Sequence, residues 1–222
     1  MIFQISGIKK SYFQAGSEIP VLDGLNLEIQ EGESVAIVGR SGSGKSTLLS
    51  LLSAIEDPDD GEIILHDHSF SDLTGEEKIL LRAQKIGVIF QQFHLLSHYT
   101  ALENVLLPLE IQCSRVDKNL AKNLLNEVGL SGREDHYPHQ LSGGEKQRVA
   151  IARALILKPE IILADEPTGS LDINTGEEVM RLIFDLVKKQ NAALVLVTHS
   201  LELAGQCNQI LRLKDGKLMA EE

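Results

Sequence analysis

A glycine-rich stretch early in the chain has the residue types that bind phosphate. Residues 39–47 fit the pattern G-x-x-x-x-G-K-[S/T]. Glycines let backbone N–H groups point at phosphate oxygens, and a helix N-terminus adds partial positive charge. Lys45 would reach the β- and γ-phosphates, and the Ser46 hydroxyl would bind Mg²⁺. The stretch predicts a nucleoside triphosphate site formed by Gly39, Arg40, Ser41, Gly42, Ser43, Gly44, Lys45, Ser46 and Thr47.

The segments on either side predict the two elements that must hold such a loop. Residues 33–38 end in a run of four apolar side chains, which is typical of a buried strand. Residues 46–55 carry leucines at helical spacing. A glycine turn with a solvated lysine can show the same pattern, but the order strand, loop, helix favours phosphate binding.

Two adjacent carboxylates follow a second apolar strand, predicted over residues 160–164. The strand runs directly into Asp165 and Glu166. Neighbouring side chains at a strand end point to opposite faces, so the two acids could take different roles. Beside a phosphate loop, Asp165 would hold Mg²⁺ through water and Glu166 would polarise the attacking water. The alternative is an acidic turn that is simply solvated.

A second anion-binding helix N-terminus is predicted at residues 141–145, which read Leu-Ser-Gly-Gly-Glu. Ser142 and Glu145 have the spacing of a capping box, so a helix should begin here. Gly143 and Gly144 leave backbone N–H groups bare in its first turn. A single chain has one triphosphate to bind. The second site therefore most simply faces a ligand held by another subunit.

The composition indicates a globular, acidic chain. Its 222 residues, of which 43% are hydrophobic, suffice for one substantial core. No apolar run approaches the roughly 18 residues of a membrane span, and no signal-peptide pattern appears at the start. We therefore expect a cytosolic protein unless a partner holds it at a membrane. The formal net charge of −11 argues against nucleic-acid binding, and Cys113 and Cys207 are expected to be reduced thiols.

Alternation of strand and helix patterns predicts an α/β fold with a mixed-sheet core, an antiparallel β subdomain and an inserted helical subdomain. The expected strands are 2–8 (an edge strand), 21–29, 33–38, 62–65, 86–90, 160–164, 193–197 and 209–213, with a loop at 11–16 and a hairpin after 213. The expected helices are 46–55, 74–84, a helix ending at Gly129, one from 142 to 155, one around 179–187 and one after Ser200 through Gln206. We predict one domain over 1–222, with a core lobe of 1–91 and 158–222 and a helical lobe of 92–157.

The phosphate loop, the Leu-Ser-Gly-Gly-Glu stretch and the acid-ended strand, in this order, resemble the nucleotide-binding subunit of an ATP-binding cassette (ABC) transporter. The resemblance covers nearly the whole chain and implies the ABC ATPase version of the P-loop NTPase fold. It implies an ATPase that forms a head-to-tail homodimer around two ATP with Mg²⁺. Each ATP would lie between one phosphate loop and residues 142–144 of the partner. Integral membrane permease subunits are the other implied partner, and they would hold the ATPase on the cytoplasmic face of a bacterial inner membrane.

Four further residues match motifs of this family. Tyr12 matches the aromatic that stacks on adenine, although a surface aromatic is the alternative. Gln91 matches the glutamine that senses the γ-phosphate and leads toward the permease, and the adjacent Gln92 is an alternative. Asp172, within the stretch 170–172, matches the loop that crosses the dimer seam, and His199 matches the switch histidine at the γ-phosphate. The implied catalytic residues are Glu166, His199, Lys45 and Gln91, and the implied metal ligands are Ser46, Asp165 and Gln91.

Residues 93–105 and 164–169 are similar to the lipoprotein-releasing and macrolide-exporter group of the family. The chain departs from that group at Ser170, where asparagine is usual, and at Ser200, where aspartate commonly follows the histidine. The resemblance implies lipoprotein release or export from the cell envelope, with the permease docked near 91–105. An ATP-gated regulatory clamp of the cell-division type is an alternative. A P-loop kinase is disfavoured, because it has no use for residues 141–145.

Overall fold

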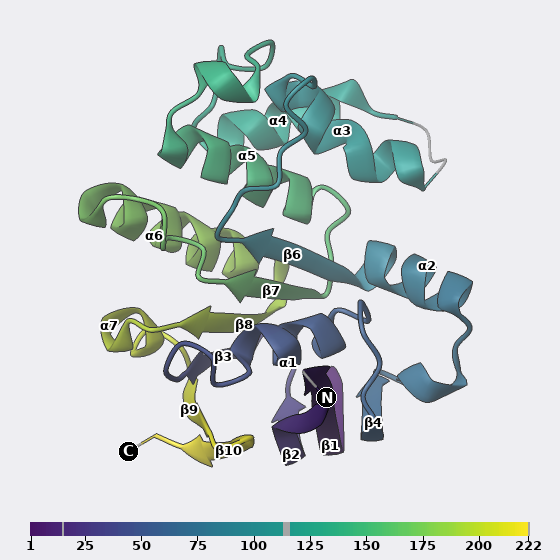
Figure 1. The fold of residues 1–222 in the computed structure, drawn as a ribbon. Helices are drawn as coiled ribbons and strands as arrows, with labels where there is room; N and C mark the ends of the chain where they lie inside the picture. Colours follow the sequence, from purple (N-terminus) through teal and green to yellow (C-terminus); the bar gives the residue numbers. More distant parts are fainter. Residues whose placement is uncertain (15, 113–115, 222) are drawn as a thin grey trace.

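The computed structural model describes residues 1–14, 16–112 and 116–221, so Cys113 lies outside the described residues (Figure 1). One sheet is antiparallel, with the order β2-β1-β4-β5, and consists of β1 (Phe3–Gln14), β2 (Ser17–Ile29), β4 (Asp60–Leu65) and β5 (His68–Ser69). The other has the order β10-β9-β3-β8-β7-β6 and consists of β3 (Ser34–Val38), β6 (Ile86–Phe90), β7 (Ile161–Asp165), β8 (Ala193–Thr198), β9 (Gln209–Lys214) and β10 (Lys217–Ala220).

The helices separate and cover the two sheets. They are α1 (Lys45–Leu52), α2 (Gly75–Lys85), α3 (Ala101–Ile111), α4 (Lys118–Glu127), α5 (Gly143–Leu155), α6 (Ile173–Gln190) and the short α7 (Leu201–Ala204). Figure 1 shows α3, α4 and α5 together at one end of the molecule and the antiparallel sheet at the other, with β6, β7, β8 and β3 of the second sheet between them. No helix within the described residues is long and apolar enough to span a bilayer.

The second sheet is buried on both faces because its central strands are continuous apolar runs. β3, β8, β7 and β6 are parallel neighbours, and β10 pairs antiparallel with β9 at the opposite edge. Side chains alternate between the faces along each strand. In β7, Ile161 and Leu163 join the cluster around α1, whereas Ile162 and Ala164 join the cluster under α5 and α6.

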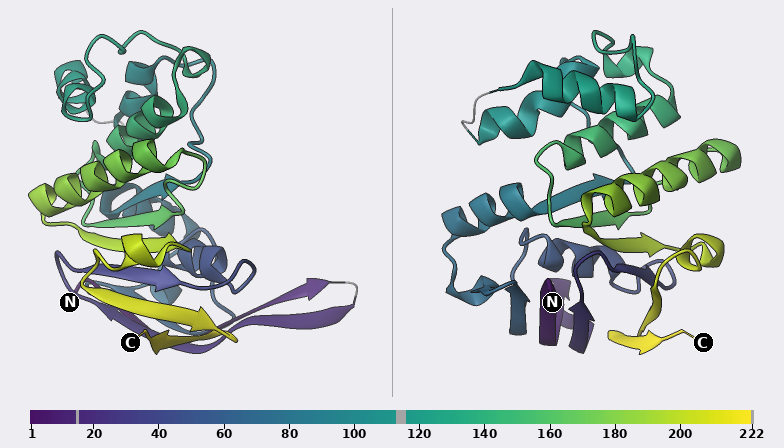
Figure 2. Two further views of the ribbon diagram at one scale, coloured as in Figure 1. Left: turned by 90° about the vertical axis from the view of Figure 1, so that its left-hand side faces the viewer. Right: turned by 180° about the vertical axis from the view of Figure 1, so that it is seen from behind.

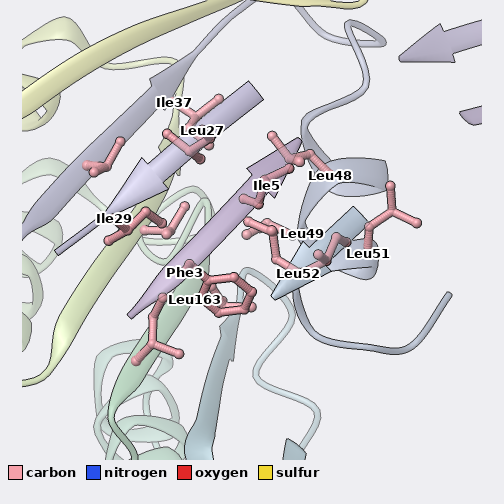
Figure 3. Close-up of a cluster of buried hydrophobic side chains, with 14 of the residues drawn as sticks. Phe3, Ile5, Leu27, Ile29, Ile37, Leu48, Leu49, Leu51, Leu52 and Leu163 are labelled. Carbon is pink, nitrogen blue, oxygen red and sulfur yellow. The ribbon is translucent and has the colours of Figure 1, made fainter. Parts of the chain in front are cut away.

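Helix α1 fills the space between the two sheets (Figure 3). Its buried leucines lie beside Phe3 and Ile5 of β1, and they belong to the same buried cluster as Leu27 of β2 and Ile37 of β3. Full burial of a leucine side chain contributes about 1.5–3 kcal/mol to stability. This packing holds the N-terminus of α1, and therefore the preceding loop, at the end of β3.

The structure corrects four boundaries. Residues 11–14, expected as a loop, continue β1, and β1 lies between β2 and β4, so it is not an edge strand. The strand persists because Tyr12 pairs with Ile19 across the β1–β2 hairpin, which projects from the body in Figure 2.

Helix α1 ends at Leu52 and not at residue 55, and α7 ends at Ala204 and not at Gln206. Residues 92–100 are not helical, because α3 begins only after the N-cap Thr100.

Candidate functional site

The phosphate loop lies between the end of β3 and the start of α1, as the sequence predicts. Gly44 is the N-cap of α1 with φ +99°, a left-handed conformation that glycine adopts without strain. At Gly39 a Cβ would lie 2.7 Å from the Leu213 carbonyl oxygen and 2.7 Å from Ser43 Oγ. The loop is therefore a close-fitting cradle in which a side chain at Gly39 has no room.

Two polar side chains of this loop fit a bound phosphate group. Lys45 is only 9% exposed, and its Nζ donates hydrogen bonds to the carbonyl oxygens of Gly39 (2.9 Å) and Arg40 (3.0 Å). The ammonium group thus lies inside the curve of the loop. The buried Ser43 Oγ has no hydrogen-bond partner among the described residues. An anion in the cradle would satisfy both groups together with the N–H groups of the first turn of α1.

Four other predicted residues come from the carboxyl ends of three neighbouring parallel strands, β6, β7 and β8. The sheet order β3-β8-β7-β6 puts the phosphate loop, His199, the pair Asp165–Glu166 and Gln91 at one edge. They surround a cavity of about 550 Å³. The cavity is lined by Tyr12, Val21, Gly39, Ser41, Gly42, Gly44, Lys45, Ser46, Thr47, Gln91, Asp165, Glu166 and His199. Ligands commonly bind outside the carboxyl ends of parallel strands.

The two adjacent acids have different partners in this cavity. The Ser46 hydroxyl donates to Asp165 Oδ2 at 3.1 Å, which brings together two oxygen donors of the kind that Mg²⁺ prefers. Glu166 has φ +45°, which turns the chain at the end of β7. Its Oε2 lies 2.8 Å from Nδ1 of His199. The Glu166 side chain is 18% exposed and that of His199 is 74% exposed, so the histidine lies on the open side of the pair.

Tyr12 lies at the rim of the cavity, on β1 and not on the predicted loop. Its hydroxyl donates to Glu56 Oε2 at 2.7 Å, and the ammonium of Lys10 is 5.6 Å from the ring centroid. Partial burial, followed by the bond to Glu56, raises the pKa of Tyr12. The phenol is therefore neutral at physiological pH and presents an apolar ring to a planar ligand.

Gln91, and not the neighbouring Gln92, lines the cavity. Two residues that follow Glu166 hold it there. The Ser170 hydroxyl donates to the Gln91 carbonyl oxygen at 3.2 Å. At Gly169 a Cβ would lie 2.7 Å from Gln91 Nε2, so the absence of a side chain makes room for the amide. The sequence placed Ser170 in the loop that matches the dimer seam and Gly169 in a stretch typical of the lipoprotein-releasing group, but it gave no sign of their contact with Gln91, because Gln91 is far away in the sequence.

Replacing Gly169 by alanine is expected to displace the Gln91 amide from the cavity. The new methyl group would overlap the end of that side chain, which would have to rotate away. If Gln91 serves turnover, kcat for ATP should fall about tenfold, since a positioned group in an active site is worth at least that factor. The control is Gly205→Ala, where the nearest atoms are 3.4 Å away. An unchanged kcat would contradict this placement of Gln91.

The remaining predicted residues do not reach this cavity. Ser142 caps α5 through the predicted capping box: its hydroxyl accepts from the Glu145 N–H at 3.3 Å, and Glu145 Oε2 accepts from the Ser142 N–H at 2.8 Å. The Ser142 N–H and then Arg133 lower the pKa of Glu145. Ser142 and Gly143 are exposed, and the neighbours of Gly143 and Gly144 are Leu171 and Thr175.

Asp172, the N-cap of α6, does not line this cavity but lines an adjoining one of about 550 Å³, whose lining also includes Glu166 and His199. Its carboxylate accepts from the Thr175 backbone N–H at 3.1 Å. Hydrogen bonds from the side chain and backbone of Thr175 lower the pKa of Asp172.

Arg40 and Ser43 line another cavity, of about 570 Å³, between the phosphate loop and the β9–β10 hairpin. Val21 lines both cavities, and its place in an ordinary strand pattern gave no signal of this.

Comparison with known proteins agrees with this geometry. The family model described as ABC transporter matches residues 22–169. The chain is 44% identical over 222 residues to the uncharacterized ABC transporter ATP-binding protein YbbA of Escherichia coli K12, covering 99% of this chain and 97% of that protein. It is 46% identical over 219 residues to the lipoprotein-releasing system ATP-binding protein LolD of Rickettsia bellii, covering 98% and 97%. It is 45% identical to the macrolide export ATP-binding/permease protein MacB of Rhodopirellula baltica, covering 100% of this chain and 33% of that protein.

Solved structures give the same result for the fold. The ATP-binding cassette MJ0796, in a dimeric post-hydrolysis state bound to ADP and Pi, superposes with a TM-score of 0.92. The two sequences are 40% identical, and the superposition covers 100% of this chain and 98% of that one. A second dimeric structure of the same cassette superposes with a TM-score of 0.91 at 41% identity. The predicted fold class is thereby confirmed.

Proposed function

The chain belongs to the ABC transporter family and is an ATPase of that family, and from this premise we propose that it works as a head-to-tail homodimer that closes on two Mg·ATP and drives a membrane permease. The observation that carries the proposal is the separation of the two anion-binding sites within one chain. The phosphate loop lines the 550 Å³ cavity, whereas the exposed Ser142 and Gly143 do not. A second copy could supply residues 142–144 to each nucleotide, and both MJ0796 structures are dimeric.

In this proposal each residue of the cavity has a distinct task. Lys45 and the N–H groups of the phosphate loop bind the β- and γ-phosphates, and the ring of Tyr12 stacks on the adenine. Ser46, Asp165 and Gln91 would hold Mg²⁺, which neutralises phosphate charge when it is bound. Glu166 accepts a proton from the attacking water, and His199, 2.8 Å away, orients the carboxylate and faces the γ-phosphate. Ser142 of the second copy and the Asp172 loop complete the enclosure.

The same proposal assigns a task to the helical lobe. Residues 92–157 would follow the nucleotide as a unit relative to the lobe of 1–91 and 158–222. The permease would dock near residues 91–105, beside a cleft of about 240 Å³ whose lining includes Arg82, Leu107 and Arg153. This would hold the ATPase on the cytoplasmic face of the inner membrane. Similarity to LolD and MacB supports lipoprotein release or export from the cell envelope as the work performed.

Replacing Gly144 by alanine tests the proposed role of the second site. A Cβ there would lie 2.5 Å from Thr175 Cγ2, so the first turn of α5 would have to shift. Turnover should fall by at least about tenfold, since it depends on donors held at the phosphate, whereas ATP binding to the phosphate loop should change less than about threefold. The control is Gly75→Ala in the first turn of α2, where no atom lies within 4 Å. Wild-type turnover by Gly144→Ala would contradict the proposal.

The function itself is tested by capture of the complex. The Glu166→Gln variant, loaded with ATP in a detergent extract of its own membranes, should retain the closed dimer and co-purify with an integral membrane subunit. A bound lipoprotein or small molecule in that complex supports the transport proposal. A membrane complex that carries no cargo and moves none in reconstituted vesicles would indicate a regulatory clamp instead. Recovery of the ATPase without a membrane subunit would contradict both functions.

A further inference from the structure

The segment between β6 and α3 has no regular secondary structure and is held by side chains from other elements. Arg153 of α5 makes the strongest of these contacts. Its Nη1 donates to the His94 carbonyl oxygen at 2.6 Å, and its Nη2 donates to the Phe93 carbonyl oxygen at 2.8 Å. A planar guanidinium with fixed donors suits two adjacent carbonyl groups in a way that a lysine ammonium does not.

A second residue of the same helix contacts the start of this segment. Gln147 is fully buried, and its Nε2 lies 3.4 Å from the Phe90 carbonyl oxygen. Its Oε1 has no partner among the described residues. Helix α5 thus contacts the backbone on both sides of Gln91: at Phe90, directly before it, and at residues 93 and 94, two and three positions after it.

The backbone bound by Arg153 is a turn that needs support. His94 has φ +47°, a conformation that costs energy in a residue with a side chain. Its ring packs edge-on against Phe90, with centroids 5.0 Å apart. Burial lowers the pKa of Arg153, yet arginine stays charged in proteins, so both bonds are charge-assisted. The strength of these bonds fixes the turn relative to α5.

We propose that Arg153 is a positioning residue that makes the Gln91–His94 segment and helix α5 move as one body. This inference rests on the proposed function, in which Gln91 meets the nucleotide of its own chain and Ser142, at the N-terminus of α5, meets the nucleotide of the other copy. Gln91 lines the cavity and Ser142 does not. Arg153 therefore connects the two ATP sites of the dimer: a shift of Gln91 at one nucleotide moves Ser142 at the other.

Hydrogen–deuterium exchange on the Glu166→Gln protein, with and without Mg·ATP, tests this connection. In that parent protein ATP should slow exchange both in the peptide 142–147 and in the peptide 92–100. Arg153→Met keeps an apolar stem and removes every donor. In this variant ATP should still slow exchange in 142–147, while exchange in 92–100 becomes at least about tenfold faster and loses its response to ATP.

Arg148→Ala is the matched control. Arg148 lies on the same helix and also binds a carbonyl oxygen, that of Val128, at 3.1 Å, and it pairs with Glu178. Because neither partner belongs to the segment 92–100, both peptides should respond to ATP as in the parent. Arg153→Lys restores one charged donor, so it should recover part of the response in 92–100. If the role of Arg153 were purely structural, Arg153→Met would have a lower melting temperature, but the ATP responses of the peptides 142–147 and 92–100 would not differ from each other.

The outcomes are distinguishable. A full ATP response of 92–100 in Arg153→Met overturns the inference and leaves the proposed function intact. No ATP response of 142–147 in the parent protein overturns the proposed function itself. Should Arg153→Met fail to melt cooperatively, Arg153→Lys decides: a response in 92–100 equal to that of the parent overturns the inference, and a partial one supports it.

Discussion

Replacing Glu166 by glutamine is expected to lower ATP turnover by about 10²–10⁴-fold, the usual contribution of a general base. The amide has nearly the shape of the carboxylate and can still lie beside His199, whose Nδ1 is 2.8 Å from Glu166 Oε2. It cannot accept a proton from water. Steady-state turnover at saturating ATP measures the loss, and equilibrium binding of ATP should change less than about threefold, since the phosphate contacts are untouched.

The matched control for this variant is Glu202→Gln. Glu202 is exposed in the first turn of α7, three positions after His199, and does not line the cavity. It should hydrolyse ATP at the wild-type rate. A Glu166→Gln protein that also turned over ATP at that rate would remove Glu166 from its proposed role and direct attention to Asp165 or His199.

Replacing Lys45 by alanine should instead weaken ATP binding itself, by about 10²-fold or more. The ammonium is the one charged group that the phosphate loop encloses, and its Nζ bonds to Gly39 and Arg40 help to keep the loop curved. A hydrogen bond to a charged group is worth about 1.5–3 kcal/mol, and each 1.4 kcal/mol is a factor of ten in affinity. Calorimetric titration with ATP measures the effect.

Lys217→Ala is the control, because it removes the same charge from an exposed position. The Lys217 side chain is 64% exposed, and its nearest acid, Asp23, is 4.0 Å away. Its ATP affinity should equal that of the wild type. Tight ATP retention by Lys45→Ala would contradict the assignment of residues 39–47 as the phosphate-binding loop.

The two variants separate the steps of the proposed cycle. Loss of Lys45 affects ATP binding, which precedes closure of the dimer. Loss of Glu166 affects ATP hydrolysis, which follows closure. A protein that binds ATP but cannot cleave it should accumulate as a closed dimer. This is why Glu166→Gln serves as the parent for capture of the membrane complex and for the exchange measurement.

Features that depend on neighbours in the sequence could be predicted from the sequence. The capping boxes that begin α2 and α5 involve residues three apart, and both are present in the structure. The apolar runs of β3 and β7 predict strands that are buried on both faces, and the glycines of residues 39–47 predict the phosphate loop. In each case the interactions that form the element lie within one turn or one strand.

Features that depend on residues far away in the sequence could not be predicted from the sequence. Residues 11–14 have no strand pattern of their own and are extended because β2 pairs with them. Helix α1 stops at Leu52, before residue 55, where the chain turns through Ala54 at φ +53°. No local signal in the sequence marks either boundary.

By itself, the sequence was enough to predict the chemistry that we propose for this protein, from the phosphate loop, the second capped helix with bare N–H groups, and the two acids after an apolar strand. Only the tertiary structure decided which of these residues meet. The order β3-β8-β7-β6 brings Gln91, Glu166 and His199 to one cavity and leaves Ser142 outside it. Gly169 and Arg153 act on the Gln91 segment from about 60 positions away or more. Strand order and such contacts arise from packing of the whole chain, which no single segment encodes.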